Sequence, residues 1–251
     1  MNFLQRGKAS LELEKKEKIE AEVRKLSQGK MFSFFLNQGE DALITFVDGE
    51  LSEDGWLEPP RCYMHTTKMG GKWENFACPQ KSIPGSTDIC PLCASADRPS
   101  LVSFFTVIDH RVYQSSKDPN KSYKDTRKIL SAKTTTFDIL AKTATALGGL
   151  AGGKFQVSRQ GEKAAAVGSM FLPLGKTPIE DLKALYQETL TDAKTGKKET
   201  KTYFEPADYS KEFVFRTGAE LAQMGLGNTN TGGVANPAGQ GATKDYSSEL
   251  G

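Results

Sequence analysis

The chain has 251 residues, a formal net charge of +2 and 37% hydrophobic residues. This length suits one large domain or two small ones, and the small net charge excludes a uniformly polycationic protein. No apolar stretch approaches the roughly 18 residues of a membrane span, and the amino terminus lacks the apolar core of a signal peptide. We therefore expect a soluble, intracellular protein.

The predicted elements begin with a charged helix over residues 8–27, whose thin apolar stripe leaves open whether it is solvated or contacts a partner. From Met31 onward, short aromatic and β-branched runs between turn residues predict strands. Glycines end one predicted helix, and a proline opens another. In chain order we predict strands at 31–36, 42–49, 59–67, 72–77, 101–113 and 127–134, a helix at 136–149, strands at 154–159 and 166–175, a helix at 178–190, strands at 199–209 and 211–217, and a helix at 218–226.

This order of elements predicts a mainly β protein with helical additions, in the α+β class, built around a barrel. We divide it into a charged helical segment at 1–28, a core at 29–225 and a Gly/Asn/Ala-rich tail at 226–251 that is expected to be disordered. In two adjacent phenylalanine pairs, Phe34–Phe35 and Phe104–Phe105, one ring of each pair is expected in the core.

All four cysteines lie within one short window, which in a reducing compartment favours a metal site over disulfides. Cys90-Pro-Leu-Cys93 is a C-x-x-C knuckle, and Cys78 precedes it by a Gly/Pro/Ser-containing loop. A hairpin through Gly70–Gly71 would bring a fourth ligand near, and spacing alone leaves both His65 and Cys62 open. A structural zinc ion takes four such ligands in a closed tetrahedron, so we expect one structural Zn²⁺ in an insertion at about 60–97.

A catalytic zinc is less consistent with these residues. Nucleobase deaminases carry a glutamate two positions after the histidine, whereas His65 is followed by Thr66 and Thr67. The metallopeptidase motif H-E-x-x-H is absent, and the chain has only two histidines. The sequence therefore predicts a protein that is not an enzyme.

The segment from His65 through Gly-Lys-Trp to Cys78, followed by Cys90-Pro-Leu-Cys93, resembles the zinc segment of the single-stranded DNA-binding (helix-destabilising) proteins of T-even and related bacteriophages, including podovirus-like relatives. The resemblance favours His65 over Cys62 as the fourth ligand. It implies an oligonucleotide-binding (OB) barrel with an inserted zinc subdomain. The basic amino-terminal motif is diluted here and the tail is far less acidic than in that family, which weakens self-association on DNA and recruitment of phage replication proteins.

The function implied by the resemblance is sequence-independent coating and protection of single-stranded DNA during phage replication, recombination and repair, in the cytoplasm of the infected bacterium. The alternative is a zinc-ribbon adaptor of a replication or transcription complex. Binding of single strands needs cations along the backbone and aromatic faces for the bases. The DNA-contacting candidates are Arg61, Tyr63, Lys68, Lys72, Trp73, Arg111, Tyr113, Lys121, Tyr123, Lys124, Arg127 and Lys128.

Overall fold

The computed structural model describes residues 31–69, 72–114, 118, 120, 122–191 and 198–227. The predicted helix at 8–27 and nearly all of the predicted tail lie outside these ranges. The described elements, in chain order, are β1 (Phe32–Ser33), β2 (Asp41–Phe46), β3 (Arg61–Met69), β4 (Lys72–Ala77), α2 (Pro79–Ser82), α3 (Pro91–Ala94), β5 (Ser100–Asp109), β6 (Tyr113–Gln114), β7 (Ser122–Tyr123), β8 (Thr126–Lys133), α4 (Thr134–Leu147), β9 (Gly153–Ser158), β10 (Met170–Lys176), α5 (Ile179–Leu185), β11 (Gln187–Thr191), β12 (Lys198–Thr202), α6 (Tyr209–Glu212) and α7 (Gly218–Gln223).

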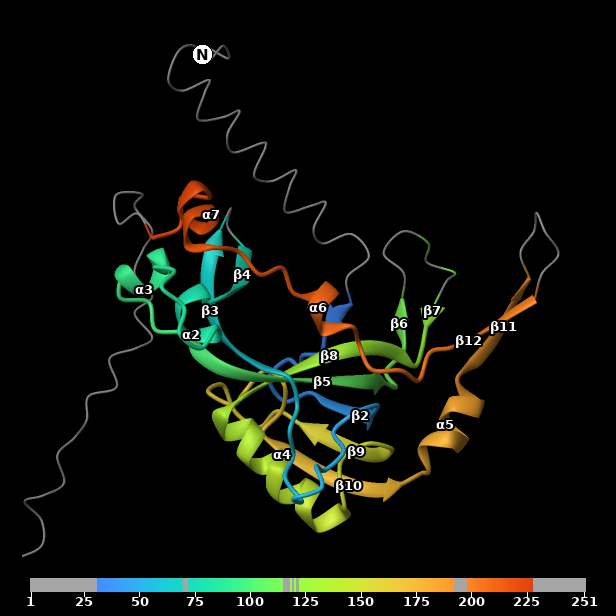
Figure 1. Ribbon diagram of the computed structural model, residues 1–251. Coiled ribbons are helices and arrows are strands. Elements are labelled where there is room, and N and C mark those ends of the chain that lie inside the picture. The colour runs from blue at the N-terminus through green and yellow to red at the C-terminus, as the bar shows by residue number, and fades with distance from the viewer. Residues whose placement is uncertain are drawn as a thin grey trace, which may run out of the picture.

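Eight of these strands form one mixed sheet, which is curved but is not a closed barrel (Figure 1). Its main path runs β1-β8-β5-β2-β9-β10, and β3 joins it by pairing with both β4 and β5. All pairs are antiparallel except β1 with β8. The chain is therefore mainly β with helices, as the sequence predicts. None of the described helices has the length and apolar character needed to cross a membrane.

The main core lies inside the curve of this sheet, with α4 packed against its open side (Figure 1). Phe46, Phe105 and Phe155 are fully buried there, and the ring of Phe46 meets the other two edge-on. Helix α4 contributes Leu140 and Ala144 to this core. Its apolar face is complementary to the alternating inward side chains of the strands, and burial of both drives the packing.

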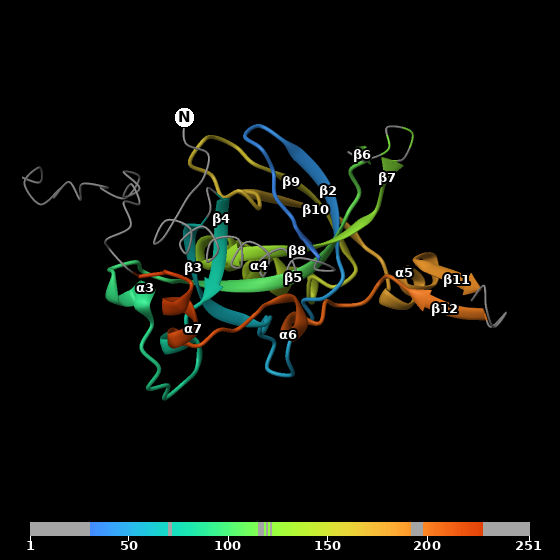
Figure 2. The same ribbon diagram turned by 90° about the horizontal axis from the view of Figure 1, so that it is seen from above.

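The hairpin β3–β4 projects from the sheet at one end, together with α2, α3 and α7 (Figures 1 and 2). The hairpin β6–β7 projects at the other end. The carboxyl-terminal segment 203–217 runs between these ends, across the outer face of β5 and β8 (Figure 1). Phe104 on that outer face packs against Phe213, with ring centroids 4.2 Å apart, and against Tyr209.

Two predicted elements are shorter than expected, and one is wrong. The predicted helix at 178–190 ends at Leu185, because residues 187–191 pair with β12 as a two-stranded ribbon. The predicted strand at 199–209 ends at Thr202, and irregular chain follows it up to α6. The predicted strand at 211–217 is wrong, because these residues are the end of α6 and irregular chain, in which Phe213 packs against the outer face of the sheet.

Candidate metal centre and its surroundings

The four ligand candidates come from three neighbouring parts of the chain. His65 lies in the middle of β3, Cys78 directly follows β4, Cys90 directly precedes α3, and Cys93 is the third residue of that helix. Cys78 and Cys90 are the residues before α2 and α3, and each is followed by a proline at the first helical position. A proline there fixes the backbone for helix entry, so each thiol is held at a defined turn.

The ligand atoms of His65, Cys78, Cys90 and Cys93 all lie within 4.8 Å of one another. The Sγ atoms of Cys78 and Cys93 are 3.6 Å apart, and His65 Nε2 is 3.4 Å from Cys90 Sγ and 3.6 Å from Cys93 Sγ. With Zn–S near 2.3 Å and Zn–N near 2.0 Å, tetrahedral ligands would be separated by roughly 3.8 Å (S to S) and 3.6 Å (S to N). The cluster can therefore hold one metal ion, and its spacing suits a tetrahedron.

His65 is oriented by a carboxylate. Its ring is fully buried, and Nδ1 is 3.0 Å from Asp97 Oδ2. Burial lowers the pKa of His65, against the opposing effect of Asp97. A neutral imidazole that donates Nδ1–H to Asp97 leaves the lone pair of Nε2 directed at the thiols, which is the arrangement that metal-ligating histidines use.

Two of the thiols, Cys90 and Cys93, hold their protons more tightly than a free cysteine. Burial and the neighbouring Cys78 raise the pKa of Cys93 to about 12, and burial also raises the pKa of Cys90. A metal ion must displace these protons, so binding at this cluster would release protons and depend on pH.

Cys62 is not part of the cluster. It lies on the opposite face of β3 from His65, in a separate apolar cluster, with its Sγ 3.1 Å from Met64 Sδ. Burial raises its pKa to about 11, so it behaves as an ordinary buried thiol. Of the two open candidates for the fourth ligand, the structure brings His65 to the other cysteines.

Helix α7 packs beside the four ligand candidates although it lies far from them in the sequence. We call this part of the molecule, made of β3–β4, α2, α3 and α7, the metal end. Leu221 and Leu226 pack with Phe76, Cys78 and Cys90 in one buried cluster. The backbone N–H of Gly218 donates to Asp88 Oδ2 at 2.9 Å. A Cβ at Gly218 would lie 2.0 Å from the Ile89 carbonyl oxygen, so only glycine fits at this contact. The sequence predicts the helix but gives no sign of where it docks.

The predicted DNA contacts on the hairpin β3–β4 are mostly exposed. Lys68 and Trp73 are opposite each other in the β3–β4 register, and 59% of the Trp73 side chain is exposed. Arg61 is exposed, with its guanidinium carbon 4.1 Å from the centroid of the Phe137 ring. Tyr63 is half-buried beneath Lys81. The side chain of Lys72 lies outside the described part.

Three further candidates form a network around a buried carboxylate instead of presenting free groups. Asp109 is fully buried and accepts from Arg111, from Tyr113 Oη at 2.6 Å and from Lys128 Nζ at 3.1 Å. Burial alone would raise its pKa, but these donors lower the pKa of Asp109 to about 2. Arg111 also pairs with Glu40, and Lys128 is buried. Their positive charges are therefore neutralised within the protein.

The remaining candidates lie around β7. Tyr123 is 44% exposed, Lys124 is exposed, and Arg127 donates to the Glu205 carbonyl oxygen at 3.0 Å. Lys121 lies outside the described residues. The two groups of candidates thus lie on separate hairpins at opposite ends of the sheet (Figure 1).

Two exposed aromatic rings near the Asp109 network were not among the predicted contacts. Phe32 on β1 is 78% exposed and Phe35 is 56% exposed, whereas Phe34 between them is buried. Arg111 donates to the Phe35 carbonyl oxygen, which ties this strand to the Asp109 network. The prediction of one core ring per pair is confirmed for Phe34–Phe35. It is wrong for Phe104–Phe105, where both rings are buried because the sheet is covered on both faces.

Comparison of the chain with protein-family models, curated proteins and solved structures gave no match in any of the three.

Proposed function

We propose that this protein binds single-stranded DNA without sequence specificity, coating and protecting it during phage DNA replication, recombination and repair. It makes and breaks no bond, and the cytoplasm of the infected bacterium is where this role would be exercised. One structural Zn²⁺ on His65, Cys78, Cys90 and Cys93 would hold the hairpin that presents Trp73. Three sulfur donors and one imidazole, buried and spaced for a tetrahedron, support zinc over a hard cation.

The strand order supports an OB-fold interpretation of the core. The meander β2-β5-β8 is followed by a helix, α4, and then by the hairpin β9–β10, which returns to lie beside β2. This is the order of a five-stranded Greek-key barrel of that type, with β3–β4 inserted after its first strand. The OB-fold face that usually binds oligonucleotides corresponds here to the outer side of β5 and β8, and residues 204–213 cover it.

The observation that carries the proposal is a set of exposed aromatic rings on elements that rise on the same side of the sheet. Phe32, Phe35 and Tyr123 surround the Asp109 network at one end, and Trp73 stands on the zinc hairpin at the other. Figure 1 shows both hairpins rising on this side of the sheet. Base–aromatic stacking contributes about 1–3 kcal/mol per base and tolerates any sequence.

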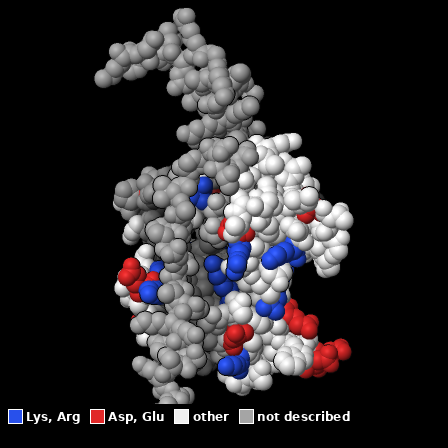
Figure 3. Space-filling model, turned by 90° about the vertical axis from the view of Figure 1, so that its left-hand side faces the viewer, with Lys and Arg blue, Asp and Glu red and all other residues white. Residues whose placement is uncertain are grey.

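Electrostatic attraction is expected to be moderate. Arg111 and Lys128 are neutralised by acidic partners. On the side that carries α2 and α3, the visible described surface intersperses Lys and Arg with Asp and Glu (Figure 3). Phosphate contacts would come from exposed side chains such as Arg61 and Lys68, so affinity should fall with salt in proportion to these few contacts.

The chain has two tryptophans, which makes a matched experiment available. Both rings are exposed, Trp73 on the zinc hairpin and Trp56 in the turn between Leu51 and Leu57. In Trp56→Phe the fluorescence reports Trp73 alone, and in Trp73→Phe it reports Trp56 alone. We expect oligo-dT to quench the fluorescence of the first variant saturably and to leave that of the second nearly unchanged. Duplex DNA of equal length should bind much more weakly than the single strand. Equal affinity for duplex and single strand would reject the proposal.

A zinc-ribbon adaptor remains the second candidate because of two apolar side chains on the metal end. Ile83 and Ile89, on the loop between α2 and α3, are 58% and 74% exposed. Exposed aliphatic groups on a metal-braced loop suit protein contact better than contact with a phosphate backbone. Absence of quenching in both single-tryptophan variants, with a zinc-loaded folded protein, would favour this function.

A further inference from the structure

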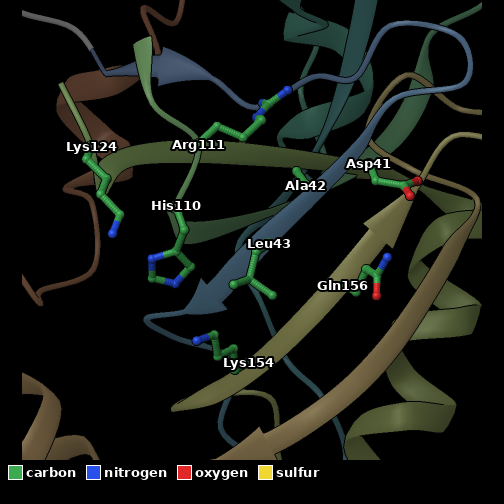
Figure 4. Close-up of a pocket in the computed structure, with 8 residues that line it drawn as sticks. All are labelled: Asp41, Ala42, Leu43, His110, Arg111, Lys124, Lys154 and Gln156. Carbon is green, nitrogen blue, oxygen red and sulfur yellow. The ribbon is translucent and has the colours of Figure 1, made fainter. Parts of the chain in front are cut away.

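A pocket of about 430 Å³ lies on the outer face of β2 and β9, away from the metal centre. Leu43 lies between its two ends, and its rim carries Lys124, Lys154 and Asp41 (Figure 4). This volume is within the range of small-ligand sites, roughly 300–1,000 Å³. None of these pocket residues has a place in the proposed metal site.

The pocket is polar at both ends and apolar between them. Lys124 and Lys154 lie towards one end, whereas Asp41 and Gln156 lie at the other (Figure 4). The strand register explains this: Leu43 pairs with Gln156, and the next outward row pairs Thr45 with Lys154. Asp41 and Thr45 are four residues apart on β2, which is about 13 Å along a strand.

The two lysines supply the charge that a ligand would meet. Both are exposed, and neither ammonium group has a carboxylate partner within the part of the chain that the structure describes. The side-chain nitrogens of Arg111 and His110, which also line the pocket, are already engaged. Arg111 is paired with Asp109 and Glu40, and both ring nitrogens of His110 are taken, one by Asp125 and one by the Thr45 hydroxyl.

We propose that this pocket binds a nucleotide unit, with its phosphate between Lys124 and Lys154 and its sugar and base along Leu43 towards Gln156 and Asp41. A phosphate monoester carries about −1.5 to −2 charges near neutral pH, which two ammonium groups balance. Leu43 and the amide and carboxylate groups beyond it suit a base, which has an apolar face and a hydrogen-bonding edge. The choice of a nucleotide rests on the proposed function, whereas the phosphate end rests on the lysines alone.

The test uses the full chain and three probes: dAMP, deoxyadenosine and inorganic phosphate, each titrated by NMR chemical-shift perturbation. We expect dAMP to bind saturably and at least tenfold more tightly than either of the other two. Lys124→Gln/Lys154→Gln should weaken dAMP at least tenfold. Lys142→Gln, an exposed lysine on α4, is the matched control and should leave it unchanged. Equal binding of dAMP and deoxyadenosine, or wild-type affinity in the double variant, would overturn the proposal.

A competition arm identifies the source of the nucleotide. Displacement of dAMP by oligo-dT would make the pocket part of the bound strand's path, and simultaneous binding of both would make it a separate mononucleotide site. These titrations distinguish failure of the proposed single-strand function from failure of the proposed nucleotide pocket. A protein that ignores oligo-dT yet binds dAMP through the lysines loses the single-strand function and keeps the pocket. One that binds oligo-dT but not dAMP loses only the pocket.

Discussion

The core of the main sheet and the metal end are stabilised in different ways. The sheet core is a continuous set of large apolar side chains, including Phe46, Phe105 and Phe155, contributed by strands that pair with one another. The metal end has a smaller core, in which Cys78 and Cys90 are buried with Phe76, Leu92, Leu221 and Leu226. The first can be stable from packing alone, whereas the second brings distant segments together around four ligand atoms.

The largest expected effect is therefore removal of the metal. Structural zinc contributes on the order of 10 kcal/mol to the folding of small zinc domains. Chelation should abolish hydrogen-exchange protection in residues 61–97 and 218–226, while strands β2, β5 and β9 keep theirs. Cys62→Ala is the control and should retain both metal and protection. Equal loss of protection in these three strands would contradict the separation of the two regions.

The next largest effects are expected from truncating a core side chain in each region. Phe155→Ala should lower the global free energy of unfolding by about 3–5 kcal/mol, because it leaves a cavity among the aromatic rings of the sheet core. Leu221→Ala should cost about 2–5 kcal/mol, seen mainly as local opening of α7 and the metal end. Urea unfolding measures the global effect, and hydrogen exchange measures the local one. If Leu221→Ala destabilised the strands of the main sheet as much as Phe155→Ala does, the metal end would not be an independent unit.

Asp48, which is hydrogen-bonded to Tyr209 of the segment covering β5 and β8, should make the free energy of unfolding depend on pH by about 3 kcal/mol. Burial raises the pKa of Asp48 to about 6, against hydrogen bonds from Tyr209 and Thr106 that lower it. A carboxyl group whose pKa is raised in the folded state contributes stability below about pH 4, and this is lost as pH rises through 6. Asp48→Asn should flatten that slope in urea titrations between pH 4 and 7. An unchanged slope would show that Asp48 does not retain its proton.

The smallest expected effect is on metal affinity, and it is tested by comparing two histidine–carboxylate pairs. Asp97 contacts Nδ1 of the ligand candidate His65, and Asp125 contacts Nδ1 of His110, which has no thiol neighbours. Asp97→Asn should weaken metal affinity by about 10- to 100-fold, the usual cost of losing such a partner. Asp125→Asn should leave the affinity unchanged. Competition with a chromophoric chelator measures both, and similar losses would mean that Asp97 has only a general structural role.

Local spacing was enough to predict much of the metal end. Cys90 and Cys93 share one tight turn, and the Gly-Lys-Trp hairpin places His65 near Cys78, so neighbours in sequence become neighbours in space. The choice between Cys62 and His65 was not accessible from spacing, because it depends on which face of β3 turns towards the knuckle. That face is set by the second apolar cluster, which takes up Cys62.

Contacts between distant segments could not be predicted. Arg111, Tyr113 and Lys128 look like an interleaved basic and aromatic surface, but Asp109 and Glu40 pair with them through the fold. The docking of α7 and the covering of Phe104 likewise depend on residues more than a hundred positions away. Strand existence was predicted well because alternation is local, and α5 was overextended because β11 is defined only by its partner β12.

The contrast between the two regions depends on the proposed ion, so the most direct measurement is metal analysis with X-ray absorption on the native full chain. One zinc per chain is predicted, with three sulfur ligands near 2.3 Å and one nitrogen near 2.0 Å. A protein purified without metal, or one whose zinc has four sulfur ligands including Cys62, would contradict it.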